Sequence, residues 1–157
     1  MWGIELRAAR QADAEFLYGL LKATMQAYVA QVWGWDEQWQ RAYFQEHFDP
    51  SQEQIVILEG EEIGVLAIQE KEDAVFLSKV YLLPEYQGQG IGTHLMRSVL
   101  DGAFGRGLPV TLRVLKVNPA RRLYERLGFV AAGETETHTL MEARPPGSPR
   151  SSTEEAL

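Results

Sequence analysis

The sequence predicts a single α/β domain with a mixed, mostly antiparallel sheet flanked by helices. Several β-rich runs are separated by turn residues, and other segments place apolar residues at helical spacing. No internal repeat or linker divides the chain. With 157 residues, 45% of them hydrophobic and 24% charged, the chain is long enough for one ordinary core.

The first half of the chain reads as a strand, two helices and three strands. Residues 4–9 alternate as in a strand, and residues 12–29 carry large apolar residues at helical spacing. Gly34 interrupts this pattern, and Asp36 is expected to cap a short, aromatic helix over residues 37–47. The runs 54–59, 63–70 and 74–83, separated by Gly60 and by acidic residues, predict an antiparallel meander that Pro84 ends.

The second half alternates helices and strands. Residues 91–104 predict an amphipathic helix with an apolar face. Residues 110–117, almost all β-branched or leucine, predict a strand covered on both faces. A helix over residues 119–127 should end at Gly128, and residues 129–141 predict a final strand or hairpin. We therefore expect one domain over residues 1–143 and a flexible tail rich in proline and serine over residues 144–157.

Composition excludes several classes of function. The net charge of -7, from 15 basic and 22 acidic residues, disfavours nucleic acid as a partner unless basic residues cluster. The chain has no cysteine, which rules out disulfides and thiolate chemistry and favours a reducing, cytoplasmic setting. Its first ten residues include three charges, and it contains no uncharged apolar run of membrane-spanning length. We expect no targeting signal and no membrane partner.

The most informative segment is the glycine loop between the third strand of the meander and the amphipathic helix. Three of its residues, Gly88, Gly90 and Gly92, allow the backbone to approach a ligand, and the helix start that follows presents unpaired N–H groups. This pattern indicates an anion site, and a tight turn with packed glycines is the structural alternative. No Lys-Ser or Lys-Thr follows the last glycine, and the strand that ends at Val117 offers no acidic residue for a nicotinamide ribose, which disfavours a P-loop or a Rossmann site.

Two motifs resemble the GNAT superfamily of acyl-CoA N-acyltransferases. Gln87-x-x-Gly90-x-Gly92 matches the first, and the segment from Asn118 through Tyr124 to Phe129 is similar to the second. The resemblance extends from about residue 6 to residue 141. It implies a sheet that splays between the strand before the glycine loop and the next strand. Asn118 lies two residues before Ala120, where the commonest form of the motif has a spacing of three.

The resemblance implies acetyl-CoA as acyl donor and assigns residues to it. The pyrophosphate would be held by Gln87, Gly88, Gln89, Gly90, Ile91, Gly92 and Thr93, the pantetheine arm would pair with the backbone of Tyr81, Leu82 and Leu83, and Asn118 is carried over as a cofactor residue. Tyr124 would be the general acid that protonates the coenzyme thiolate. From spacing alone, Tyr124 also fits a packed helix stripe with Ala120, Leu123 and Leu127.

The sequence assigns no general base and no metal. Many relatives carry a glutamate on the strand over residues 74–83, but this strand carries Ser78 and Lys79 and no carboxylate, so water is one alternative. Other acidic or imidazole groups fit solvated or turn positions more simply; they are Glu70, Asp36, Glu37 and His138. The three histidines lack metal-ligand spacing.

We therefore expect an N-acetyltransferase that transfers acetyl directly to a primary amine of a small molecule or peptide. In this family the first helices and their connection largely select the substrate, and here they hold the candidates Trp33, Trp35 and Asp36. A catalytically silent acyl-CoA-binding module is the alternative. The sequence leaves open the acceptor, the length of the acyl group and the oligomeric state, for which a homodimer is one alternative.

Overall fold

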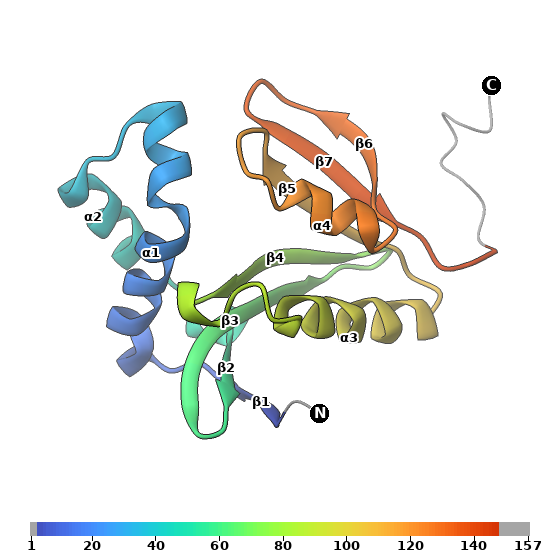
Figure 1. Cartoon of the computed structure of the whole chain (residues 1–157), viewed down its shortest axis with the longest axis horizontal. Helices are drawn as coiled ribbons and strands as arrows, with labels where there is room; N and C mark the ends of the chain where they lie inside the picture. The colour runs from blue at the N-terminus through green and yellow to red at the C-terminus, as the bar shows by residue number, and fades with distance from the viewer. Residues whose placement is uncertain (1–2, 148–157) are drawn as a thin grey trace. The chain divides into compact units, whose positions relative to one another are not determined.

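The computed structural model describes residues 3–147 and has the predicted α/β architecture. Seven strands form an open mixed sheet in the order β1-β2-β3-β4-β5-β7-β6, with helices flanking it (Figure 1). Within the described residues, the chain forms two compact units. The first runs to Gln69 and includes Leu77–His94, and the second comprises Glu70–Phe76 and the chain from Leu95 onward. Of the predicted tail, residues 148–157 lie outside the described residues.

The first unit holds the predicted strand, helix pair and meander. Strand β1 (Ile4–Ala8) pairs antiparallel with β2 (Gln54–Leu58), and β2 pairs antiparallel with β3 (Glu61–Glu70). Most of β4 (Val75–Leu82) follows in the same unit. Helices α1 (Ala14–Trp33) and α2 (Glu37–His47) lie side by side in Figure 1 and contribute to one core with these strands. Its buried members include Leu17, Leu20, Phe44, Ile55 and Val65.

The connection between α1 and α2 begins later than predicted but ends at the predicted helix cap. Helix α1 continues to Trp33, four residues beyond the predicted end, and stops where Gly34 adopts a φ of 82°. Trp33 therefore stands on the last turn of a helix instead of in the connection. On the other side, the Asp36 carboxylate accepts a hydrogen bond from the Trp39 amide at 3.0 Å, as expected of an N-cap.

The second unit is built on three strands. Strand β5 (Val110–Leu115) pairs antiparallel with β7 (His138–Ala143), which pairs antiparallel with β6 (Val130–Glu134), so the last segment is a hairpin. The prediction for β5 was wrong in two respects, because the strand ends at Leu115 and Arg113 is exposed on it. Strand β4 pairs parallel with β5 through Val75 with Val110 and Phe76 with Thr111, all within this unit.

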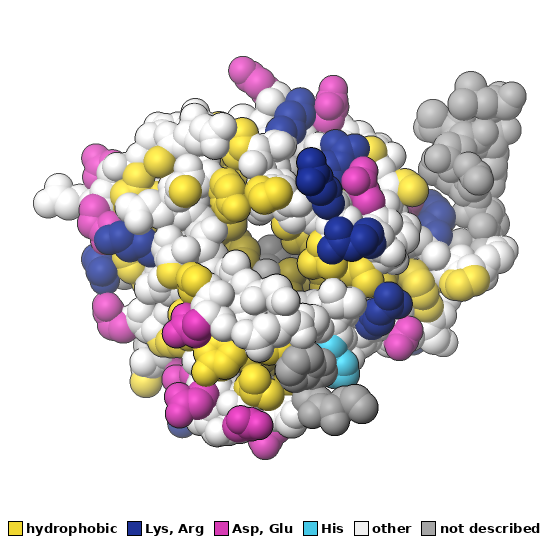
Figure 2. Space-filling model, viewed as in Figure 1, with side chains coloured by type: hydrophobic (Ala, Val, Ile, Leu, Met, Phe, Trp, Pro, Cys, Tyr) yellow, Lys and Arg dark blue, Asp and Glu magenta, His cyan; other side chains and the backbone are white. Residues whose placement is uncertain are grey.

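Two helices carry the motifs that the sequence singled out. Helix α3 (Ile91–Gly105) buries Ile91, Leu95, Met96, Leu100 and Ala103, so most of the predicted apolar face is confirmed. Helix α4 (Arg121–Arg126) is a short helix of six residues. Dark-blue side chains gather over α4 in Figure 2, where Arg121, Arg122 and Arg126 are exposed. This chain of net charge -7 therefore has a locally basic surface.

Candidate functional site

The glycine loop links the end of β4 to the start of α3 within the first unit. After Leu82 the chain makes a single 3-10 turn over Pro84–Tyr86, and α3 begins at Ile91. Gly88 has a φ of 74° and Gly90 a φ of 89°, values that residues with a side chain adopt only with strain. The loop thus needs glycine at both positions for its backbone conformation. The first amides of α3 follow directly, which is the arrangement that favours anion binding at a helix N-terminus.

Hydrogen bonds hold the base of this loop closed. The Gln87 side-chain amide donates to the Leu82 carbonyl at 2.9 Å, and the Gln89 side-chain amide donates to the Glu85 carbonyl at 2.8 Å. The Leu83 amide donates to the Ile63 carbonyl at 2.8 Å, so it serves the sheet. Gln87 therefore has a structural task in addition to its candidate role, because it ties the loop to the last residue of β4.

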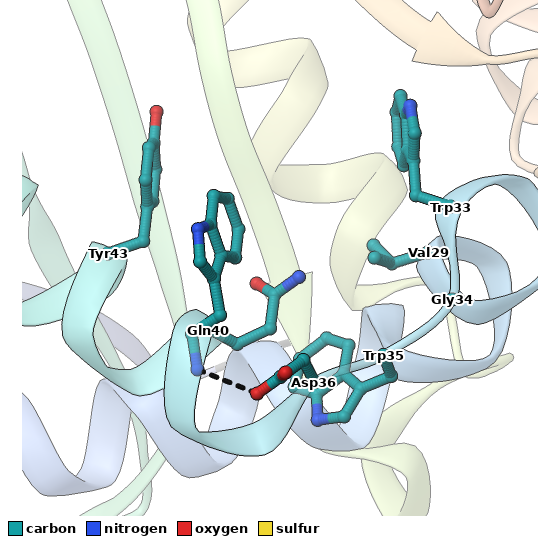
Figure 3. A pocket seen from close by; sticks show the side chains of 8 residues that line it. Val29, Trp33, Gly34, Trp35, Asp36, Gln40 and Tyr43 are labelled. Atoms are coloured by element: carbon teal, nitrogen blue, oxygen red, sulfur yellow. Dashed lines mark hydrogen bonds between the residues drawn. The ribbon is translucent and has the colours of Figure 1, made fainter.

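A cavity of about 760 Å³ lies at the junction of α1 and α2, in the same unit. It brings together the three residues predicted to select the substrate, Trp33, Trp35 and Asp36 (Figure 3). The remaining lining residues are Val29, Gly34, Trp39, Gln40 and Tyr43. Trp39 and Tyr43 are four residues apart on one helix, so they lie on the same face and extend the aromatic lining.

The ionisable groups considered as a base are mostly engaged elsewhere. Glu37 contacts Trp35 and Lys22, and the Glu70 carboxylate pairs with Arg106 at 2.6 Å. Burial and the nearby Arg113 lower the pKa of His138. A lowered pKa leaves the His138 imidazole mainly neutral near pH 7, while the Glu37 and Glu70 carboxylates are held in ion pairs.

A partly buried ion pair that the sequence did not predict joins β4 to the residue before β2. The Lys79 ammonium lies 2.9 Å from the Glu53 carboxylate and 5.9 Å from the centre of the Phe44 ring. Glu53 is 7% exposed, and its second oxygen, Oε1, has no hydrogen-bond partner among the residues that the structure describes. Strand β3 lies between β2 and β4, as the pairing of Gln54 with Leu66 and the hydrogen bond from Leu83 to Ile63 show. The ion pair between Glu53 and Lys79 therefore reaches across β3.

Tyr124 and Asn118 belong to the second unit. The half-buried Tyr124 packs its ring edge-on against Phe129, with ring centres 6.0 Å apart, and this contact does not involve the hydroxyl. Burial raises the pKa of Tyr124 above its ordinary value of 10.0, so the phenol is protonated near neutral pH. The Asn118 side-chain oxygen accepts a hydrogen bond from the Ala120 amide at 2.9 Å, which fixes the start of α4.

No helix within residues 3–147 is both long and apolar enough to span a membrane. Over the same range, no cluster of three or more His, Cys, Asp or Glu residues has an arrangement that could hold a metal ion.

The fold and the glycine loop define an acetyltransferase-like domain, and comparison with known families agrees. The model of the acetyltransferase (GNAT) family matches residues 15–129, well over half of the chain. The chain belongs to this family.

Named relatives and solved structures give the context. The chain is 36% identical over 101 residues to the N-acetylaspartate synthetase of Danio rerio, covering 62% of this chain and 34% of that protein. It is 39% identical over 64 residues to the thialysine N-epsilon-acetyltransferase of Mus musculus, covering 40% and 38%. The matches thus span just over a third of these relatives. The PaiA N-acetyltransferase of Thermoplasma acidophilum, in complex with coenzyme A, superposes with a TM-score of 0.74 at 18% identity, covering 90% of this chain and 99% of that one.

Proposed function

We propose that the protein transfers an acetyl group from acetyl-CoA to a primary amine of a small molecule or peptide. The observation that carries this proposal is the backbone of the glycine loop. Gly88 and Gly90 take positive φ values immediately before the first turn of α3. Such a loop exposes amides to an anion without intervening side chains. The match to the GNAT family over residues 15–129 supports the pyrophosphate of coenzyme A as that anion.

In this proposal the donor is held mainly by backbone groups. Amides from Gln87 to Thr93 bind the pyrophosphate, and the strand end at Tyr81, Leu82 and Leu83 serves the pantetheine arm. The Leu83 amide already donates to Ile63. The Leu82 carbonyl likewise accepts from the Gln87 side chain, so pantetheine recognition at this strand falls to other backbone groups of Tyr81, Leu82 and Leu83. Gln87 keeps the loop against Leu82, and Asn118 sets the start of α4.

The chemical step needs one proton removed and one supplied. The neutral amine nitrogen attacks the thioester carbon, the new C–N bond forms, and the C–S bond breaks as the sulfur leaves with its electron pair. The Tyr124 hydroxyl gives its proton to the sulfur, and the proton lost by the amine passes to water. Burial raises the pKa of Tyr124, which keeps the phenol protonated and available as an acid at neutral pH.

The aromatic cavity between α1 and α2 is proposed to receive the acceptor. It contains Trp33, Trp35 and Asp36 in one space of about 760 Å³, a size within the range of small-ligand sites. The named relatives are an N-acetylaspartate synthetase and a thialysine N-epsilon-acetyltransferase. Their names favour an amino acid or another amine as the acceptor class.

The test is acetyl transfer by the purified chain to a panel of primary amines. The release of free coenzyme A thiol measures the transfer. Binding is measured separately through thermal unfolding, where a ligand at a hundredfold excess over Kd stabilises by about 2.7 kcal/mol. We expect acetyl-CoA and coenzyme A to raise Tm, and NAD and ATP at equal concentration to leave it unchanged.

Two results would contradict parts of the proposal. Equal stabilisation by NAD or ATP would remove the specific assignment to coenzyme A. Binding of acetyl-CoA without turnover across amino acids, diamines and peptide N-termini would instead support the alternative of a silent acyl-CoA-binding module.

A further inference from the structure

The cavity between α1 and α2 has an unusual set of walls for a surface site. Four of its eight lining residues are large aromatics, and Asp36 is the one charged residue among the eight. Trp33, Trp39 and Tyr43 are 58%, 58% and 48% exposed, although side chains of this size are normally more buried. Exposed aromatics gathered at a cavity indicate a binding surface. The walls therefore provide apolar area together with a single negative charge.

Internal contacts fix two of the aromatic walls before any ligand arrives. The Trp39 ring stacks on Tyr43 with centres 5.1 Å apart, and Tyr43 stacks on His47 at 4.0 Å. The rings form a continuous stack along the exposed face of α2. Because the stack restrains side chains that solvent would otherwise leave free, a ligand loses less entropy when it orders them. Figure 3 shows Tyr43 and Trp33 standing on opposite sides of the cavity.

Glu37 fixes the third wall, and this task occupies its carboxylate. It accepts a hydrogen bond from the Trp35 indole N–H at 3.0 Å and another from the Tyr18 hydroxyl at 3.1 Å, and it pairs with Lys22 at 2.9 Å. These contacts, that from Trp35 foremost, lower the pKa of Glu37 to about 2. Glu37 is thus a positioning residue that joins α1 to α2 and orients Trp35. Its charge is balanced within the protein.

Asp36 differs from Glu37 because its charge stays at the cavity. One carboxylate oxygen accepts from the Trp39 amide as the helix cap, and the side chain is exposed. The cap is a bond to a neutral amide and leaves the full negative charge beside the indole rings. The faces of indole rings attract cations, and the effect grows when the cation is partly desolvated. A carboxylate adjoining such rings adds direct electrostatic attraction.

We infer that this cavity binds an alkylammonium group, with its carbon atoms against the indole rings and its charge beside Asp36. Because this cavity is the proposed acceptor site, the inference rests on the proposed function, and it narrows the acceptor to a cationic amine. An acceptor with a second ammonium, such as a diamine or a lysine-like amine, keeps one charge in the cavity while the other amine is deprotonated and reacts. Neutral and acidic amines of equal size gain nothing from Asp36.

The binding test uses choline and its neutral isostere 3,3-dimethylbutan-1-ol, neither of which has an amine to acetylate. Three of the four tryptophans of the chain line the cavity, so intrinsic fluorescence reports binding directly. Isothermal titration provides the second measurement. We expect choline to bind at least about tenfold more tightly than the alcohol, the scale of a partly desolvated cation–π contact. Equal affinities, or no binding of either probe, would overturn the inference.

A matched pair of variants isolates the charge. Asp36→Asn keeps a good helix cap and removes the charge at the cavity. Asp49→Asn makes the same change at a second capping aspartate, whose carboxylate accepts from the Ser51 amide and which does not line the cavity. We expect Asp36→Asn to weaken choline about tenfold and the alcohol hardly at all, and Asp49→Asn to change neither. Equal effects of the two variants would refute the role of Asp36.

The same protein separates this inference from the proposed function. Turnover of acetyl-CoA with simple amines, without choline binding, would leave the function standing and remove the cation site. Choline binding without any binding of coenzyme A would support the cation site and contradict the proposed function. In Glu37→Ala, checked for folding by its Tm, we expect both probes to weaken together because Trp35 loses its orientation. Unchanged affinity for both probes would show that Glu37 does not position the wall.

Discussion

A Cβ atom placed on Gly64 would lie 2.3 Å from the carbonyl oxygen of Tyr81 and 2.8 Å from Leu82 Cδ2. The buried Gly64 on β3 therefore allows a close approach of the β4 backbone at the segment proposed to serve the pantetheine arm. Its role is steric, since no positive φ is involved.

Gly64→Ala should accordingly destabilise the fold and displace this segment. We expect a loss of roughly 1–3 kcal/mol in the free energy of unfolding, the usual cost of overpacking, and weaker coenzyme A binding. Urea unfolding and titration calorimetry measure the two effects. Gly133→Ala is the matched control, because its Cβ would lie 3.4 Å from a flexible Leu140 side chain. If both variants bound coenzyme A like the parent, the Gly64 contact would have no bearing on the site.

The glycine loop offers a similarly matched comparison. Gly88 and Gly107 share a φ of 74°, and a Cβ on either would have no heavy atom of the described part of the chain within 4 Å. Gly88→Ala and Gly107→Ala should therefore cost the same backbone strain, about 1 kcal/mol in the free energy of unfolding. Only Gly88→Ala should weaken coenzyme A, measured by titration calorimetry, because Gly107 follows the end of α3. Equal coenzyme A affinities in the two variants would refute the phosphate cradle.

Local signals in the sequence predicted most of the elements and their order. The apolar spacing of α3, the turn around Gly60 and the Asp36 cap act within a few residues, so the sequence displays them directly. The prediction ended α1 too early, at Val29, although Val32 and Trp33 continue its helical spacing, and the helix stops where Gly34 takes a positive φ. Helix ends are the least certain part of such readings.

The parts of the site that depend on strand register could not be predicted. Glu53, just before β2, and Lys79, on β4, meet only in the folded sheet, and the steric role of Gly64 depends on its position beside Tyr81 and Leu82. These relationships join residues far apart in sequence, and a single sequence contains no signal for their pairing. By contrast, Trp33, Trp35 and Asp36 were predicted because they lie within four residues of one another.

Stability should fall in acid partly through Asp13. Its carboxylate binds the Arg7 guanidinium at 2.8 and 2.9 Å and accepts from the Arg10 amide, and the bond to Arg7 is the main reason that its pKa lies at about 2 instead of 3.8. A depressed carboxyl pKa contributes stability above the unfolded value and loses it as pH falls through the folded value.

The window for Asp13 therefore runs from about pH 4 down to pH 2. We expect a contribution on the order of 1 kcal/mol after solvent screening of this pair. Urea unfolding of the parent and of Asp13→Asn, followed from pH 6 to pH 2, measures it. The stability difference between the two proteins should shrink across the window. A constant difference would mean that Asp13 contributes through packing and not through its charge.

Tyr124→Phe separates catalysis from packing at the residue proposed as general acid. The ring that packs against Phe129 is kept, and only the hydroxyl is lost. If the hydroxyl protonates the coenzyme thiolate, the single-turnover rate should fall on the order of 10²-fold while coenzyme A affinity and Tm barely change. Single-turnover measurement is needed because slow product release would mask a loss in the chemical step. Since burial raises the pKa of Tyr124, its ionisation should not limit the parent rate below pH 10. If the stably folded variant reacted at the parent rate, Tyr124 would not be the acid, and water or another residue would protonate the thiolate.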